Sequence, residues 1–197
     1  GHALDHLFLL IFATAVSAIA AEWGMIWQDL MPYTVGAFVL FGLGSLPSGR
    51  LGDHWGRRKM MLVFFFGMGA SMLLVAATNG PWQLAIALTL MGMFSAIYHP
   101  VGIPLLLRGA PRPGLTIGIN GLAGNLGVAL AAVVTGVVVK YAGWRAAFVV
   151  PALLAFVAGI AFARVAPDEP LPPARRAATQ EEIPSRLLAH IFGVITV

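Results

Sequence analysis

One histidine lies well inside a long apolar stretch of this 197-residue chain, and its neighbours give it two candidate roles. His99 stands between Tyr98 and Pro100. Pro100 lacks a backbone donor, so the carbonyl of Ala96 loses its helical partner and we expect a kink there. His99 either hydrogen-bonds around this kink or faces a cavity as a ligand for a substrate or a proton, because ionisable groups inside a membrane are rare and mark functional sites. Tyr98, beside His99 on the same possible path for a substrate or a proton, is expected to make a packing or interfacial contact.

Two asparagines in the next apolar stretch are further candidates for the substrate or proton path. Asn120 and Asn125 are five residues apart, about 140° around a helix, so they cannot both face one cavity squarely. Asn120 is expected to make a hydrogen bond between helices. Asn125 is expected near the substrate path.

The other chemistry that the chain could carry is limited. Four carboxylates map to helix ends or loops, so none is expected near the centre of the bilayer: Asp5, Glu22, Asp29 and Asp53. There is no cysteine, and the eight methionines are scattered, so neither thiol chemistry nor a metal site is indicated.

Two classes of enzyme are excluded because their sequence motifs are absent. No phosphate-binding Gly-rich motif is present, so the chain itself does not use ATP. The protease motif Gly-x-Ser-Gly is also missing, because the residue three before Gly49 is Leu46. We therefore expect that the chain has no enzymatic activity and binds no cofactor.

A dense charged segment, residues 49–59, separates two apolar runs that can each cross a bilayer. It predicts a tight turn at a membrane face. Gly49 and Gly56 would let two backbones approach closely, Asp53 could lie against the N-terminus of a neighbouring helix, and Arg57 and Arg58 would hold their charge at the boundary.

Composition places these residues in a membrane protein. The chain is 59% hydrophobic and only 10% charged, which is incompatible with a soluble core under a polar surface. Hydrophobic length predicts six spans and an all-α integral membrane fold. The expected helices cover residues 4–22, 32–49, 60–78, 82–107, 115–139 and 144–165.

Basic residues fall on one side of these spans, ten against two of the twelve in the chain. This asymmetry predicts that residues 49–59 and the N-terminus are cytoplasmic, because positive loops stay inside. Since the charge sets orientation, no nucleic-acid partner is inferred from it.

Three segments follow from this pattern. Residues 1–166 are expected to form the six-helix bundle, the Pro-rich residues 167–186 a cytoplasmic linker, and residues 187–197 the start of a seventh, truncated helix. The chain begins with Gly1 and without an initiator Met, so both ends are interpreted as limits of a longer protein.

The charged segment Gly-Arg-Leu-Gly-Asp-His-Trp-Gly-Arg-Arg-Lys resembles the G-x-L-x-D-x-x-G-R-R/K loop between the second and third helices of the major facilitator superfamily. The resemblance covers the whole chain. It implies the first six-helix half, built from 3+3 inverted repeats, the linker, and the beginning of the second half of the same chain. The Tyr-His-Pro segment and the run from Gly118 to Gly127 are most similar to fosmidomycin-resistance-type facilitators.

The resemblance also implies a function. A facilitator would be a secondary transporter of a small solute, working by alternating access in a bacterial inner membrane, and proton-coupled efflux is one form of this. Asp53 would cap a helix of the second half, and Arg57 would hold the cytoplasmic gate closed. Two departures from drug antiporters weigh against proton antiport of drugs: Leu88 stands where many carry Arg, four residues before Gly92, and the Gly-Pro pair of their fifth helix is absent.

A second hypothesis remains open beside transport. The chain could be a non-transporting subunit that uses a facilitator scaffold to hold partners or lipids in a larger membrane complex. The sequence beyond Val197 would distinguish the two, because five further spans around a charged cavity favour transport.

Small residues recur on the predicted fifth helix and suggest a surface for close contact. Asn120, Gly124, Val128, Ala132 and Gly136 follow one another every four residues. This row predicts a narrow, smooth face, either for ordinary helix packing or for movement against the second half.

Overall fold

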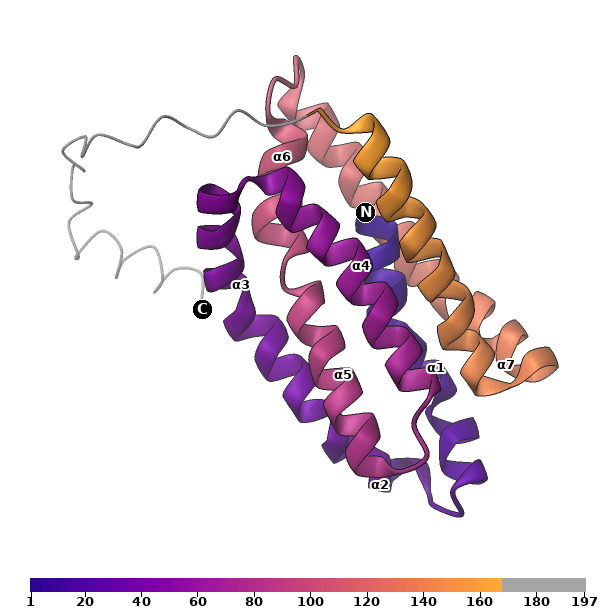
Figure 1. Cartoon of the computed structure of the whole chain (residues 1–197). Helices are drawn as coiled ribbons and strands as arrows, with labels where there is room; N and C mark the ends of the chain where they lie inside the picture. The colour runs from indigo at the N-terminus through magenta and orange to yellow at the C-terminus, as the bar shows by residue number, and fades with distance from the viewer. Residues whose placement is uncertain (168–197) are drawn as a thin grey trace, which may run out of the picture.

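The computed structural model describes residues 1–167, and this part of the chain is built of helices without a strand (Figure 1). The predicted linker, apart from Pro167, and the predicted start of a seventh helix lie outside the described residues. The elements follow in this order: α1 (His2–Glu22), α2 (Trp27–Leu30), η1 (Met31–Thr34), α3 (Val35–Trp55), α4 (Arg57–Ala76), α5 (Pro81–Ser95), η2 (Tyr98–Gly102), α6 (Ile103–Leu107) and α7 (Pro113–Val165).

The long element α7 is two helices joined at a sharp turn. It contains 53 residues, about 80 Å of helix at the usual rise, whereas a bilayer core is about 30 Å thick. Gly143 breaks it with φ 83°, a left-handed conformation that glycine adopts without strain. Figure 1 shows the chain running away from α6 before this turn and back after it. With α7 divided at this turn, the five long apolar helices of the described chain are long enough for the six crossings that hydropathy predicts.

The core lies between α1, α4 and the two parts of α7, where large side chains such as Phe8, Phe64, Met68 and Phe148 are fully buried. By contrast, α3 contacts mainly α5 and leaves much of its apolar surface exposed, including Phe38 and Leu46. Such a surface would be unstable in water. It suits a membrane helix that faces lipid or another part of the protein.

Opposite the end that carries α6, charged side chains tie three helices together. Arg145 forms an ion pair with Glu22, with 2.6 Å between Nη1 and Oε1, and also donates to the Thr78 carbonyl. The Trp144 indole N–H donates to the same Glu22 at 2.8 Å. These contacts join the end of α1 and the segment after α4 to the returning part of α7, directly after its turn.

The contact between α3 and α5 depends on glycines. A methyl group added at Gly92 would overlap the carbonyl of Ala37, so the two backbones touch where a side chain cannot fit. Close approach through small residues is the usual way that membrane helices pack, because lipid supplies no hydrophobic force between them.

We expect Gly92→Ala to destabilise the protein by about 1–3 kcal/mol, the usual effect of forcing extra atoms into a packed contact. Gly42→Ala is the matched control, since a methyl group there meets nothing within 4 Å. Thermal unfolding in detergent, followed by size-exclusion chromatography, measures the difference. Equal midpoints for both variants would show that the close contact is not needed.

Candidate functional site

The predicted kink is confirmed and positions His99. Helix α5 ends at Ser95, and the chain continues as one turn of π-helix, η2, before α6 begins. Pro100 lies within this turn and supplies no backbone donor, so the α-helical hydrogen bonds are interrupted there. The turn directs His99 toward the first turns of α1.

Asp5 meets His99 there. The sequence places Asp5 at a helix end, and the structure agrees, but the side chain is fully buried between helices instead of facing solvent or headgroups. Ser95 donates its hydroxyl hydrogen to Asp5 Oδ1 at 2.5 Å. Asp5 Oδ2 has no hydrogen-bond partner within the described chain and lies 3.5 Å from Nε2 of His99.

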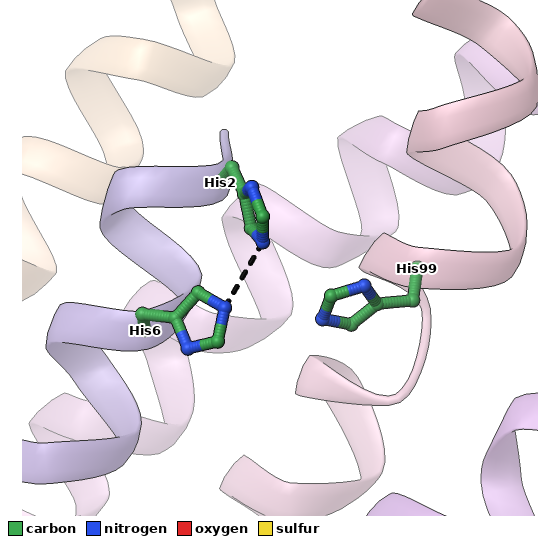
Figure 2. Close-up of side chains that lie close together, drawn as sticks. All are labelled: His2, His6 and His99. Atoms are coloured by element: carbon green, nitrogen blue, oxygen red, sulfur yellow. Dashed lines mark hydrogen bonds between the residues drawn. The ribbon is translucent and has the colours of Figure 1, made fainter. Parts of the chain in front are cut away.

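Two further histidines complete this cluster (Figure 2). His2 and His6 are one helical turn apart on α1, and their Nε2 atoms are hydrogen-bonded at 2.9 Å. The ring centre of His99 lies 5.3 Å from that of His2 and 5.9 Å from that of His6. We refer to His2, Asp5, His6 and His99 as the histidine cluster.

Asn120 and Tyr98 join the histidine cluster to the first part of α7. The Tyr98 hydroxyl donates to Asn120 Oδ1 at 2.8 Å, which confirms the predicted interhelical hydrogen bond of Asn120. His2 Nδ1 donates to the Asn120 carbonyl at 2.6 Å, and its ring stacks on that of Tyr98. Three of the four sequence candidates, His99, Tyr98 and Asn120, are thus brought together.

Asn125 is not part of this arrangement. Its side chain is exposed on the first part of α7. Its predicted place near the substrate path stays a prediction.

The charged segment, residues 49–59, which we call the signature segment, has a different local structure from the predicted turn. Helix α3 continues through Asp53 to Trp55, and only Gly56, with φ 96°, separates it from α4. Gly56 therefore supplies a left-handed conformation. Gly49 lies beside Pro100, where an added methyl group would be 3.5 Å from the proline Cβ, so the end of α3 packs against the turn that carries His99.

The charged side chains of the segment stay near its surface. Arg57 pairs with the exposed Asp53 at 3.1 Å, one helical turn away. Arg58 donates to the carbonyls of Ala163 and Ala166 at 2.6 and 2.8 Å and so ties the start of α4 to the end of α7. The structure places the residues of the predicted gating loop, Gly49, Asp53, Gly56, Arg57 and Arg58, along one end of the bundle.

A cavity of about 410 Å³ begins beside the histidine cluster. It is bordered by α1, η1, α3, α5 and the first part of α7. Its walls are almost entirely apolar, and His6 is the one ionisable residue among the described residues that line it. Leu88, the residue that stands in place of the Arg of many drug antiporters, forms part of the wall. Its apolar lining includes Leu10, Phe38, Phe41, Leu88 and Val128.

Comparison with known proteins decides the family. The sequence pattern of the Major Facilitator Superfamily matches residues 2–195. The chain belongs to this superfamily. With its apolar helices, this facilitator is an integral membrane protein.

Similar curated proteins are transporters or resistance proteins. The facilitator is 30% identical over 75% of its length to "Probable actinorhodin transporter" of Streptomyces coelicolor, covering 26% of that protein. It is 27% identical over 76% of its length to "Tetracenomycin C resistance and export protein" of Streptomyces glaucescens, covering 29%. It is 31% identical over 64% of its length to "Puromycin resistance protein pur8" of Streptomyces alboniger, covering 26%. The chain thus spans less than a third of these three relatives.

Sequence reasoning missed His2, Asp5 and His6. The available signal was their spacing, because positions i, i+3 and i+4 share one face of a helix. A histidine, an aspartate and a histidine in that pattern, at the start of an apolar helix, could have been read as a polar cluster facing inward.

Proposed function

We propose that this facilitator forms the first half of a secondary transporter that moves a small, largely apolar organic solute by alternating access. The observation that carries the proposal is the apolar cavity bordered by α1, α3, α5 and α7, with the histidine cluster at its edge. A volume of about 410 Å³ is within the usual range for small-molecule sites, and an apolar wall with a few polar groups is their usual composition.

The second half of the same chain would close the cavity. Transporters of this kind bind solute between two halves that rock against each other, so the exposed walls of one half are the expected form of an incomplete site. The contact of α3 with η2 offers a mechanical link, since a movement of the charged end of α3 would be passed to the turn that carries His99. Proton-coupled efflux stays a prediction from the sequence.

The test is transport by the full-length protein in sealed vesicles that hold an imposed ion gradient and no nucleotide, with puromycin and tetracenomycin C as probes, because relatives are named for these compounds. We expect at least one probe to accumulate against its gradient. Phe41→Ala, which alters the cavity wall, should raise its KM about tenfold, equivalent to ~1.4 kcal/mol of binding.

Leu43→Ala is the matched control, because Leu43 lies on the same helix, is exposed and does not line the cavity. Equal effects of the two variants on KM would show that the solute does not bind in this cavity. No transport of any probe, together with stable capture of other membrane proteins, would favour the scaffold hypothesis.

We also propose that the end of the bundle with the signature segment faces the cytoplasm of a cell whose inner membrane holds the protein. His54 is exposed at that end and Gln28 is exposed in α2, at the other end. In a cysteine-free background, a membrane-impermeant maleimide added to intact cells should label Gln28→Cys and leave His54→Cys unlabelled until the membrane is opened. The reverse pattern would invert the orientation.

A further inference from the structure

The three imidazoles of the histidine cluster converge on one point. One ring nitrogen from each of His2, His6 and His99 can be chosen so that all three lie within 4.8 Å of one another (Figure 2). We propose that these nitrogens, together with Asp5 Oδ2, bind a divalent transition-metal ion of the zinc class. This inference does not depend on the identity of the transported solute.

A tetrahedral site needs the side chains to close in, because the three nitrogens lie within 4.8 Å of one another and Asp5, which is outside that group, approaches from beside His99. Zinc–nitrogen bonds of about 2.0–2.1 Å place neighbouring ligand atoms roughly 3.3–3.4 Å apart. The His2 and His6 Nε2 atoms, at 2.9 Å, need to separate slightly, and Asp5 Oδ2, 3.5 Å from His99 Nε2, is already close to the required spacing. Two histidines four residues apart on one helix face are also the arrangement that helical zinc motifs use.

Hydrogen bonds outside the cluster orient its ligands. His2 Nδ1 donates to the Asn120 carbonyl, so Nε2 is left with its lone pair toward the other rings. This is the usual arrangement for a histidine ligand, whose second nitrogen is held by a carbonyl or a carboxylate. Ser95 holds Asp5 Oδ1 in the same way and leaves Oδ2 directed at His99.

The buried carboxylate is the second, independent observation. Asp5 is fully buried, and Oδ2 has no hydrogen-bond partner within the described chain, although buried polar atoms are nearly always paired. A metal ion would satisfy that oxygen and balance its charge. Imidazole with one carboxylate suits zinc, cobalt or nickel, whereas calcium and magnesium prefer oxygen ligands alone.

The test uses the full-length protein without a polyhistidine tag, stripped with a chelator and titrated with Zn²⁺. We expect one ion per chain. His6→Gln and His99→Gln should each weaken binding by about 10- to 100-fold, and Asp5→Asn should weaken it as well. His54→Gln, outside the cluster, should bind like the unaltered protein.

Cobalt gives a second readout on the unaltered protein, which does not depend on the folding of variants. We expect Co²⁺ to produce the intense visible absorption of a four-coordinate site, and Zn²⁺ to abolish it. Absence of stoichiometric binding, a weak six-coordinate spectrum, or affinity that survives both histidine substitutions would overturn the proposal.

Discussion

Asp5→Asn is expected to lower transport by the full-length protein about tenfold or more while leaving its amount in the membrane nearly unchanged. Asparagine keeps the size of the side chain and can still accept from Ser95, but it removes the charge that faces His99. A hydrogen bond to a charged group contributes about 1.5–3 kcal/mol, more than a neutral one. A factor of ten corresponds to ~1.4 kcal/mol, so this loss is large enough to change the balance of conformations.

Initial rates of probe transport into vesicles, divided by the amount of folded protein, measure the effect. Asp29→Asn is the control, because Asp29 is also an aspartate of the N-terminal third but is exposed at the other end of the bundle. If both variants transported at the normal rate, Asp5 would be a structural residue of the α1–α5 contact and nothing more.

The membrane fold and the kink could be predicted because both depend on local chemistry. Length and hydropathy define a span whatever its neighbours are, and a proline disrupts its own helix. The residue at which α3 ends was harder to predict. Hydropathy falls at Gly49 because the chain leaves the lipid there, but the backbone stays helical to Trp55, so the prediction marked the edge of the apolar run and missed the end of the helix.

The histidine cluster could not be predicted from position alone. Asp5 lies in the first turn of α1, where carboxylates commonly face headgroups, but its partners are Ser95 at the end of α5 and His99 in η2, ninety or more residues later in the chain. Only the spacing of His2, Asp5 and His6 was visible in advance. That pattern gives a shared face and leaves open what the face contacts.

The smooth face of α7 shows a similar limit. The row at four-residue intervals, from Asn120 to Gly136, predicted the contact surface. The structure buries Gly124 of this row, but its other buried residues there are Gly127, Ala131 and Thr135, whereas Val128 and Ala132 are exposed. Steps of four advance about 40° beyond a full turn, so such a row winds away from its neighbour, whereas mixed steps of three and four stay on one face. Gly127 and Ala3 are so close that a methyl group would overlap the Ala3 carbonyl.

Asp53→Asn should also lower transport about tenfold, with normal insertion, but for a different reason. Its pair with Arg57 joins an exposed carboxylate to a half-buried guanidinium one turn away, and pairs near the surface contribute at most ~1 kcal/mol. A large effect must therefore come from a contact that Asp53 makes with the second half in one conformation only. A shift of ~1.4 kcal/mol between two conformations changes their ratio tenfold.

Exchange of the two charges separates these explanations. Asp53→Arg combined with Arg57→Asp restores an ion pair within the segment, so it would recover transport if the pair itself were what matters. We expect no recovery, because a partner in the second half would then meet a charge of the wrong sign. His54→Gln, an exposed neighbour, should transport normally. Recovery in the exchanged variant would assign Asp53 to the local structure of the α3–α4 junction, and the gate would have to be sought elsewhere.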